Sequence, residues 1–347
     1  MKQRKLELYD NTRISSSRTC LRMFMFRHEL AWEALGTKPA LAFGGSWHKA
    51  MDSLWPDMIA LKGKEGWLPR WSDVREEIVT KAFAHFMEEW VSRYQMPGID
   101  EMEGQEYNDL RPRVPTTALE MLYVYADERR TFFTTGDIEL LAVEKPFVVP
   151  LDPKDDSLFY CGRFDKLIRW NGRIHGIEHK TTTAYARNGP FRTSFVEGFS
   201  PNSQIDGYLF AGRSEYGREF KNIMVDAALV HNNETAFRWI NIERQTEMLD
   251  GWLWTARYYI NQIQANRRAL SEELARNEEP SKYLAAFPQN TSSCIQFETT
   301  CTYLDLCKSW ANPIGRDIPA GFQFSPWEPF EELELHKVFS AKGRRKA

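Results

Sequence analysis

Residues 158–181 read LFYCGRFDKLIRWNGRIHGIEHKT, in which two strand-like runs flank the dipeptide Asn171-Gly172. Asparagine followed by glycine supplies the positive φ angles that a two-residue type I′ hairpin turn requires. The dipeptide therefore predicts an antiparallel hairpin in which Trp170 pairs with Arg173. The turn also fixes every other pair along the two runs, because side chains alternate between the faces of a strand.

This register brings two carboxylates together. Asp165 lies directly across from Glu178 on one face, and Arg163 lies across from Lys180. Opposed Cβ atoms in such a ladder are about 4.5–5.5 Å apart, and like charges placed there destabilise the sheet. A raised carboxyl pKa or a cation resolves the conflict, and Mg²⁺ or Mn²⁺ suits oxygen ligands of this kind. The alternative is an exposed hairpin whose charges form a loose ion-pair network.

Three residues near this pair are further candidates. Strand alternation puts Lys180 on the carboxylate face, where its ammonium can orient or deprotonate a metal-bound water or neutralise a phosphate. His179 points to the opposite face, so its backbone carbonyl is the better candidate ligand. His48 lies beside Trp47 on an apolar helical stretch. It is a candidate metal ligand, with a packed core histidine as the alternative.

Composition excludes several classes of protein. The 347 residues carry 45 lysines and arginines against 48 aspartates and glutamates, a net charge of −3. This balance excludes a protein that coats nucleic acid through bulk positive charge, so any nucleic-acid site must be local. No apolar run approaches the roughly 18 residues of a membrane span. The start, MKQRKLELYD, lacks the apolar run of a secretory signal, so we expect a cytoplasmic protein that does not enter a membrane.

The hydrophobic pattern predicts an α/β fold, with a central mixed β-sheet flanked by helices. Helical spacing occupies 12–60, 72–95, 116–133 and 246–277, and a further helix is expected to open at Ser200-Pro201. Strand-like runs cover 138–150, 158–170, 173–181, 221–230 and 236–243. Serines are expected to cap two helices, Ser15 to Ser17 at the first and Ser46 after the pair Gly44-Gly45.

No linker interrupts the chain, so a single domain over 1–347 is expected. Its parts are N-terminal helices with the first cysteine and His48 (12–64), a helical insertion (65–137), the core with the hairpin (138–245), a long helix with a cysteine cluster (246–310) and a tail (311–347).

Short motifs, in this order along the chain, resemble those of the PD-(D/E)XK nuclease superfamily. The run Gly162-Arg163-Phe164-Asp165 is similar to its G-x-x-D motif, and Glu178-His179-Lys180 is similar to its E-x-K motif. His48 resembles the upstream metal-ligand histidine of the RecB-like branch. Gln204 and Tyr208 resemble the Q-x-x-x-Y motif of that branch, on the helix that follows the E-x-K strand.

Four of the five cysteines lie at the two ends of the chain, as Cys20, Cys294, Cys301 and Cys307. Four thiolates can hold a [4Fe–4S] cluster or a zinc ion. Either group would act as a structural staple: it would link the two outer segments of the chain and close a loop of about 270 residues. Four separately buried thiols are the alternative, and Cys161 is expected in the core. The one-plus-three order resembles the iron–sulfur members of the RecB-like branch, which include AddB-type, CRISPR-adaptation and phage-encoded nucleases. The resemblance thus implies iron–sulfur rather than zinc.

The resemblance implies a restriction-endonuclease-like fold and a metal-dependent DNA nuclease, an exonuclease in DNA repair, recombination or phage DNA processing. It implies Mg²⁺ or Mn²⁺ at His48, Asp165, Glu178 and His179, catalysis by Lys180, Asp165 and Glu178, and DNA contact or support from Gln204 and Tyr208. For the last two, an ordinary helix surface is the alternative. Single- or double-stranded DNA is the implied partner, and a helicase or recombination protein is a candidate partner. The alternative function is a non-catalytic DNA-binding or assembly protein that keeps the fold and the iron–sulfur staple.

Overall fold

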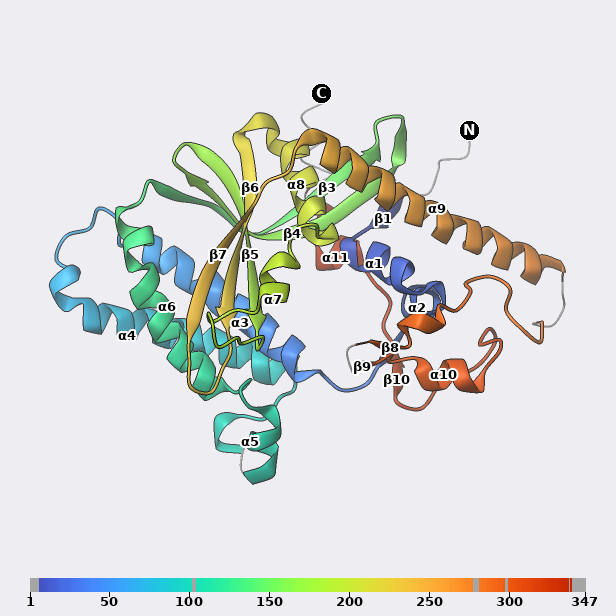
Figure 1. Cartoon of the computed structure of the whole chain (residues 1–347), viewed down its shortest axis with the longest axis horizontal. Helices are drawn as coiled ribbons and strands as arrows, with labels where there is room; N and C mark the ends of the chain where they lie inside the picture. Colours follow the sequence, from blue (N-terminus) through green and yellow to red (C-terminus); the bar gives the residue numbers. More distant parts are fainter. Residues whose placement is uncertain (1–5, 102–103, 277–280, 297–298, 337, 339–347) are drawn as a thin grey trace. The chain divides into compact units, whose positions relative to one another are not determined.

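The computed structural model describes residues 6–101, 104–276, 281–296, 299–336 and 338 (Figure 1). The chain divides into two compact units. The first unit holds Met1–Gly36, Pro146–Gly162 and Gln245–Ala347, and the second holds Thr37–Lys145 and Arg163–Arg244. Strands β3 (Ile138–Asp152) and β4 (Asp155–Trp170) contribute residues to both units. A single domain over 1–347 remains a prediction.

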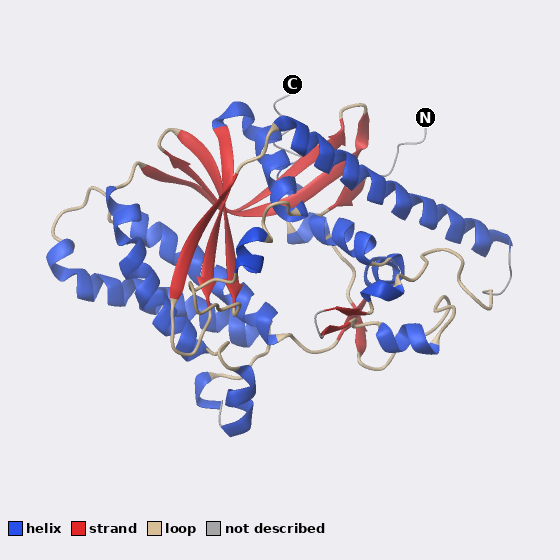
Figure 2. Ribbon diagram, viewed as in Figure 1, coloured by secondary structure: helices blue, strands red, loops and turns tan. Residues whose placement is uncertain are grey.

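A mixed β-sheet forms the centre of the second unit (Figure 2). Strand β5 (Arg173–Thr182) pairs antiparallel with β4 and parallel with β6 (Phe220–Leu229), and β6 pairs antiparallel with β7 (Ala236–Ile242). Branched and aromatic residues fill these strands, as a pleated and half-buried surface favours. The predicted α/β class, with a central mixed sheet flanked by helices, is confirmed.

Three long helices share one hydrophobic core with the sheet of the second unit: α3 (Pro39–Ile59), α4 (Trp71–Glu88) and α6 (Pro115–Thr135). The predicted apolar stripe of α3 is confirmed, because Trp47, Met51, Leu54, Trp55 and Met58 are all fully buried. The short helix α5 (Gly104–Leu110) lies in the stretch between α4 and α6.

The expected serine caps are wrong. Helix α1 (Asn11–Thr19) is capped by the Asp10 side chain, which accepts a hydrogen bond from the Arg13 N–H, so the serine run lies inside the helix. Helix α3 begins at Pro39, because proline suits a first-turn position, and it continues through Ser46. The glycine pair before Ser46 does not break the helix, and at Gly45 a Cβ would stand 2.0 Å from the Tyr94 hydroxyl oxygen.

Two shorter helices, α7 (Thr193–Glu197) and α8 (Ser203–Tyr216), follow β5. The sequence predicted a helix opening at Ser200-Pro201, but α8 begins three residues later. Its N-cap is Asn202, whose Oδ1 accepts hydrogen bonds from the N–H groups of Gln204 at 3.0 Å and Ile205 at 3.2 Å. Asparagine at an N-cap satisfies N–H groups that have no partner inside the helix.

The first unit joins segments that are far apart in the sequence. Strand β1 (Glu7–Tyr9) pairs parallel with Leu158–Tyr160 of β4, and β2 (Trp32–Ala34) pairs antiparallel with β10 (Phe322–Phe324). The remaining elements are α2 (Leu21–Phe24), a π-helical turn (Met25–Glu29), α9 (Thr246–Arg276), β8 (Ile295–Gln296), β9 (Thr299–Thr300), α10 (Leu304–Ser309) and α11 (Pro329–Glu332). None of the described helices is long and apolar enough to cross a membrane.

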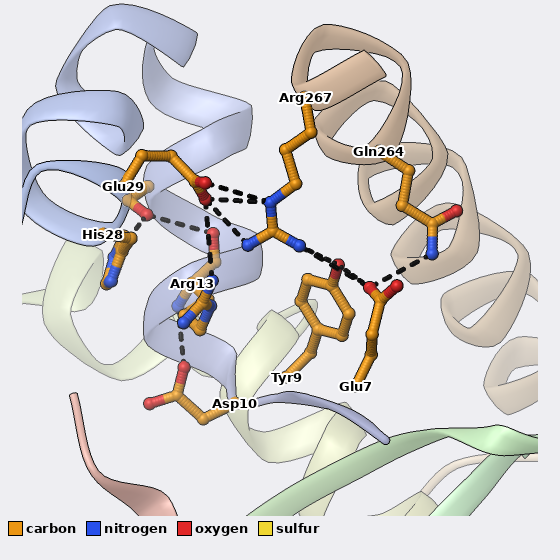
Figure 3. A network of polar contacts seen from close by, with 9 residues as sticks. Glu7, Tyr9, Asp10, Arg13, His28, Glu29, Gln264 and Arg267 are labelled. Carbon is orange, nitrogen blue, oxygen red and sulfur yellow. Dashed lines mark hydrogen bonds and ion pairs between the residues drawn. The ribbon is translucent and has the colours of Figure 1, made fainter. Parts of the chain in front are cut away.

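A polar network ties α9 to the N-terminal segment within this unit (Figure 3). The Arg267 guanidinium donates to both carboxylate oxygens of Glu29, the shortest contact being 2.7 Å, and to the Tyr9 hydroxyl at 3.2 Å. Gln264, one turn earlier on α9, donates to Glu7 at 3.2 Å. The bidentate geometry stabilises a partly buried ion pair and fixes the orientation of both side chains.

Candidate active site

The hairpin turn forms as its sequence predicts. Asn171 and Gly172 have φ angles of 49° and 74°, as a type I′ turn requires. The pairing runs from Trp170↔Arg173 to Lys166↔Ile177, which confirms the predicted register. Within the described chain this ladder ends at Lys166, so Asp165 and Glu178, which were expected to pair directly, lie one position beyond its last pair. Both carboxylates are nearly inaccessible, with exposures of 8% and 1%.

Asp165 is held by the two histidines that the sequence singled out. The backbone N–H of His179 donates to Asp165 Oδ2 at 2.8 Å, and His48 Nδ1 lies 3.4 Å from the same oxygen. The other ring nitrogen of His48 lies 2.8 Å from the carbonyl oxygen of His179. Burial alone would raise the pKa of Asp165, but the facing His48 holds it well below its usual range.

Glu178 is held from its own strand and from α8. Lys180 Nζ lies 2.5 Å from Glu178 Oε1, and Gln204 Nε2 donates to the same oxygen at 3.0 Å. The Gln204 amide also donates to the Tyr208 hydroxyl at 3.1 Å, so the three side chains form a chain from α8 to β5. Burial, reinforced by the charge of Asp165, raises the pKa of Glu178.

The opposed carboxylates are therefore compensated within the chain, by Lys180 at Glu178 and by His48 at Asp165. Burial alone would lower the pKa of Lys180, but the neighbouring Glu178 raises it, so its ammonium remains protonated. The expected position of Arg163 across from Lys180 is wrong, because the β4–β5 pairing stops before it. Arg163 instead donates to Glu144 at 2.8 Å.

Glu178 and His179 face opposite sides of β5, and different helices contact them. Gln204 of α8 reaches Glu178, while Tyr125 of α6 reaches the Asp226 carboxylate that lies 3.3 Å from the ring of His179. The alternation predicted from the strand pattern is thus confirmed, and the His179 side chain lies away from the carboxylates.

One carboxylate oxygen of this site has no hydrogen-bond partner in the described part of the chain. Glu178 Oε2 is buried and, among the described residues, makes no hydrogen bond. Among all the residues that the structure describes, no three His, Cys, Asp or Glu side chains are already close enough together to form a metal-binding group. Because His48 bridges Asp165 and the His179 carbonyl, it occupies two acceptor groups that a cation would otherwise contact.

The cysteines lie in the first unit. Cys20 follows α1, and its sulfur accepts a hydrogen bond from the Asn290 N–H at 3.3 Å. Cys294 and Cys301 flank the β8–β9 pair and are joined by a 2.8 Å backbone hydrogen bond from the Cys301 N–H to the Cys294 carbonyl. Cys307 lies in α10, and its pKa is raised to about 11 by burial, with contributions from the other three thiols. Cys161 is fully buried in a separate apolar cluster, as expected.

The sequence analysis did not identify a buried ion pair that lies next to the site. Lys166, whose side chain is fully buried, contacts Asp52 Oδ1 at 3.1 Å. Asp52 lies one helical turn after His48, and Lys166 directly follows Asp165, so the two pairs connect the same two elements. The spacing of four between His48 and Asp52 was a signal that could have identified the second pair.

Comparison with known proteins identifies related sequences. A family model described as the PD-(D/E)XK nuclease superfamily matches residues 11–308. Among solved structures, the chain is similar to one described as "Crystal structure of SSO0001", at 16% sequence identity over 59% of this chain and 73% of that chain, with a TM-score of 0.26. The search of curated proteins gave no match.

Proposed function

Because the chain belongs to the PD-(D/E)XK nuclease superfamily, we propose that it is a metal-dependent DNA nuclease of the RecB-like branch. We further propose that it degrades DNA from an end, in DNA repair, recombination or phage DNA processing. The meeting of Asp165, Glu178, Lys180 and His48 at one end of the β4–β5 hairpin carries the proposal. A cytoplasmic location and a helicase or recombination protein as partner belong to the same proposal, on the resemblance alone.

Asp165, Glu178, His48 and the His179 carbonyl would hold Mg²⁺ or Mn²⁺. Carboxylate and carbonyl oxygens with one imidazole are a donor set that these ions accept. The buried Glu178 Oε2, which has no partner among the described residues, supports this assignment because an unpaired carboxylate oxygen is costly to bury. When bound, such an ion lowers the pKa of a water molecule and neutralises charge on a phosphate.

The remaining residues orient these groups. Lys180 lies 2.5 Å from Glu178, which raises the pKa of its ammonium, so it can donate hydrogen bonds to the attacking water or to a phosphate oxygen. Gln204 fixes one oxygen of Glu178, and Tyr208 fixes Gln204. We therefore assign Gln204 and Tyr208 to the support of Glu178 rather than to DNA contact.

Arginines in and beside the segment that follows Lys180 support DNA as the substrate. The segment from Thr181 to Arg192 follows Lys180 directly and contains two arginines and no acidic residue. Arg113 donates to Thr183 at 3.2 Å, and Arg192 donates to the carbonyl of Tyr185 at 3.0 Å. Guanidinium groups beside a catalytic strand suit contacts with phosphates, which contribute most of the affinity for nucleic acid. A net charge of −3 is compatible with such a local site.

End-labelled single- and double-stranded DNA, incubated with the protein in Mg²⁺, in Mn²⁺ and in EDTA, tests the proposal. We expect degradation with either metal and none in EDTA, and mononucleotide release from one labelled end identifies an exonuclease. Binding of DNA without cleavage in every metal would instead support the non-catalytic alternative. Cleavage of closed circular DNA would contradict the requirement for an end.

We also propose that Cys20, Cys294, Cys301 and Cys307 hold a [4Fe–4S] cluster. All four cysteines belong to the first unit. Asn290 donates its backbone N–H to the Cys20 sulfur and its Nδ2 to the Thr19 carbonyl at 2.9 Å. These two contacts keep Cys20 beside the segment that leads to Cys294. Four cysteine ligands suit either this cluster or zinc. The resemblance to iron–sulfur members of the RecB-like branch favours the cluster.

Purification without oxygen tests this assignment. We expect a brown protein with about four irons and four sulfides per chain. Cys301→Ser should lose the iron, whereas Cys161→Ala should retain it, because Cys161 lies in a separate apolar cluster. A colourless protein with stoichiometric zinc would show that the four cysteines bind zinc instead of the cluster. A protein without bound metal would contradict both the cluster and the zinc site.

A further inference from the structure

A buried polar network lies behind β5, on the face opposite the carboxylates. At its centre is Asp226 of β6, whose side chain is 2% exposed. The Tyr125 hydroxyl donates to Asp226 Oδ2 at 2.6 Å, and Arg129 donates to Asp226 Oδ1 at 3.3 Å. Both donors belong to α6, in the helical insertion between α3 and β3. Trp55 of α3 donates its indole N–H to the Tyr125 hydroxyl at 2.9 Å, so the network also reaches the helix of His48.

His179 connects this network to the proposed metal ligands. Its ring nitrogen Nδ1 lies 3.3 Å from Asp226 Oδ2, and its side chain is fully buried. Its backbone N–H donates to Asp165, and its carbonyl oxygen contacts the His48 ring. One residue therefore joins α6, through Asp226, to both Asp165 and His48.

The charges of this network favour a fixed arrangement. The buried Asp226 carboxylate accepts hydrogen bonds from Tyr125 and Arg129, one on each oxygen, and the His179 ring lies beside it. The Arg129 guanidinium also lies over the Trp239 ring at 4.7 Å, which restricts its movement. A buried carboxylate that accepts hydrogen bonds from two donors can shift only at the expense of those hydrogen bonds.

We propose that Tyr125 and Arg129 are positioning residues that act through Asp226 and His179 to fix the proposed metal-binding groups. The helical insertion is then part of the catalytic unit. This inference rests on the metal site proposed above, and it concerns residues that touch neither metal nor DNA. Partners that orient metal ligands typically change metal affinity or activity by about 10–100-fold when they are removed.

Mn²⁺ binding, measured by the electron paramagnetic resonance of free Mn²⁺, tests the proposal in the full-length protein without DNA. For Tyr125→Phe and Arg129→Met we expect the dissociation constant to rise about 10-fold or more. With DNA, kcat should fall while KM for DNA stays unchanged, because the network lies on the far side of β5. Arg129→Lys keeps the positive charge and should recover most of the lost affinity.

Two variants of α6 serve as matched controls. Tyr123→Phe removes the same atom, a hydroxyl that donates to Glu76 on α4 at 2.6 Å, and should bind Mn²⁺ like the wild type. Leu122→Ala removes a buried side chain with no polar contact, and should lower the melting temperature without changing Mn²⁺ affinity. Amide hydrogen exchange of residues 176–181 supplies a readout that needs neither metal nor activity. It should accelerate in Tyr125→Phe and Arg129→Met beyond its rate in Leu122→Ala.

The proposal is overturned if Tyr125→Phe and Arg129→Met melt earlier but keep wild-type Mn²⁺ affinity, kcat and exchange of β5. The proposed function fails separately, if the wild-type protein neither binds Mn²⁺ nor cuts DNA. In that case the amide hydrogen exchange of residues 176–181 still decides whether α6 fixes the position of β5.

Discussion

Lys180→Ala is expected to reduce Mg²⁺-dependent DNA degradation by about 100–1000-fold, the usual cost of removing a group that stabilises developing charge. The protein should remain folded, because the Lys180 side chain is 31% exposed and lies at the end of its strand. Initial rates on end-labelled DNA measure the loss, and circular dichroism with thermal melting verifies the fold. Lys221→Ala is the matched control, since Lys221 lies on the neighbouring strand and pairs with the exposed Glu243.

Asp165→Asn should weaken metal binding more than Lys180→Ala does. The change removes a charge from the proposed ligand set but keeps an oxygen that can accept the 2.8 Å hydrogen bond from His179. We therefore expect activity at background and much weaker Mn²⁺ binding, with the hairpin intact. Undiminished degradation by the purified Lys180→Ala and Asp165→Asn double variant would contradict the site assignment.

Lys166→Met is expected to have the largest effect on stability. Lys166 is fully buried and its ammonium lies 3.1 Å from Asp52, whose side chain is only 15% exposed. Removing one partner of a buried ion pair costs about 3–5 kcal/mol, and here it leaves Asp52 with only the exposed Lys49 nearby. The free energy of unfolding, measured by urea denaturation, should fall by that amount, and His48 should be less well fixed because it shares α3 with Asp52.

A double-mutant cycle separates the ion pair from the packing. Combining Lys166→Met with Asp52→Leu replaces both charges by apolar groups and should restore most of the stability. Lys49→Met is the control, because Lys49 lies 3.8 Å from the other oxygen of Asp52 but is 42% exposed. Such a solvent-exposed pair contributes about 0–1 kcal/mol. A Lys166→Met loss no greater than that of Lys49→Met would show that the buried pair is unimportant.

The hairpin is the part of the site that could be predicted. Asn171-Gly172 fixes the turn through its positive φ angles, and the turn fixes the register over the next five pairs. The side of β5 on which Glu178 and Lys180 lie follows from the same alternation, because both residues are local to the turn. The prediction went wrong for Arg163, where β4 no longer pairs with β5 and the spacing ceases to apply.

Helix starts were harder to predict than helices. The apolar spacing of α3 predicted its buried face, but Ser46 was mistaken for a cap because glycines precede it. The glycines instead allow close approach, since a Cβ at Gly45 would collide with Tyr94. That contact joins residues almost fifty positions apart, and local sequence rules do not include it.

The sequence by itself determined the hairpin, its register and the residue types of the site, from Asp165 to Lys180. These depend on backbone preferences and on alternation along a few neighbouring residues. Only the tertiary structure decided which groups surround them: His48 at Asp165, Gln204 at Glu178, and Asp226 with Tyr125 and Arg129 behind His179. The reason is physical. These contacts join residues from 26 positions apart (Gln204 and Glu178) to 117 positions apart (His48 and Asp165), so they form only when helices pack on the sheet and buried charges require partners.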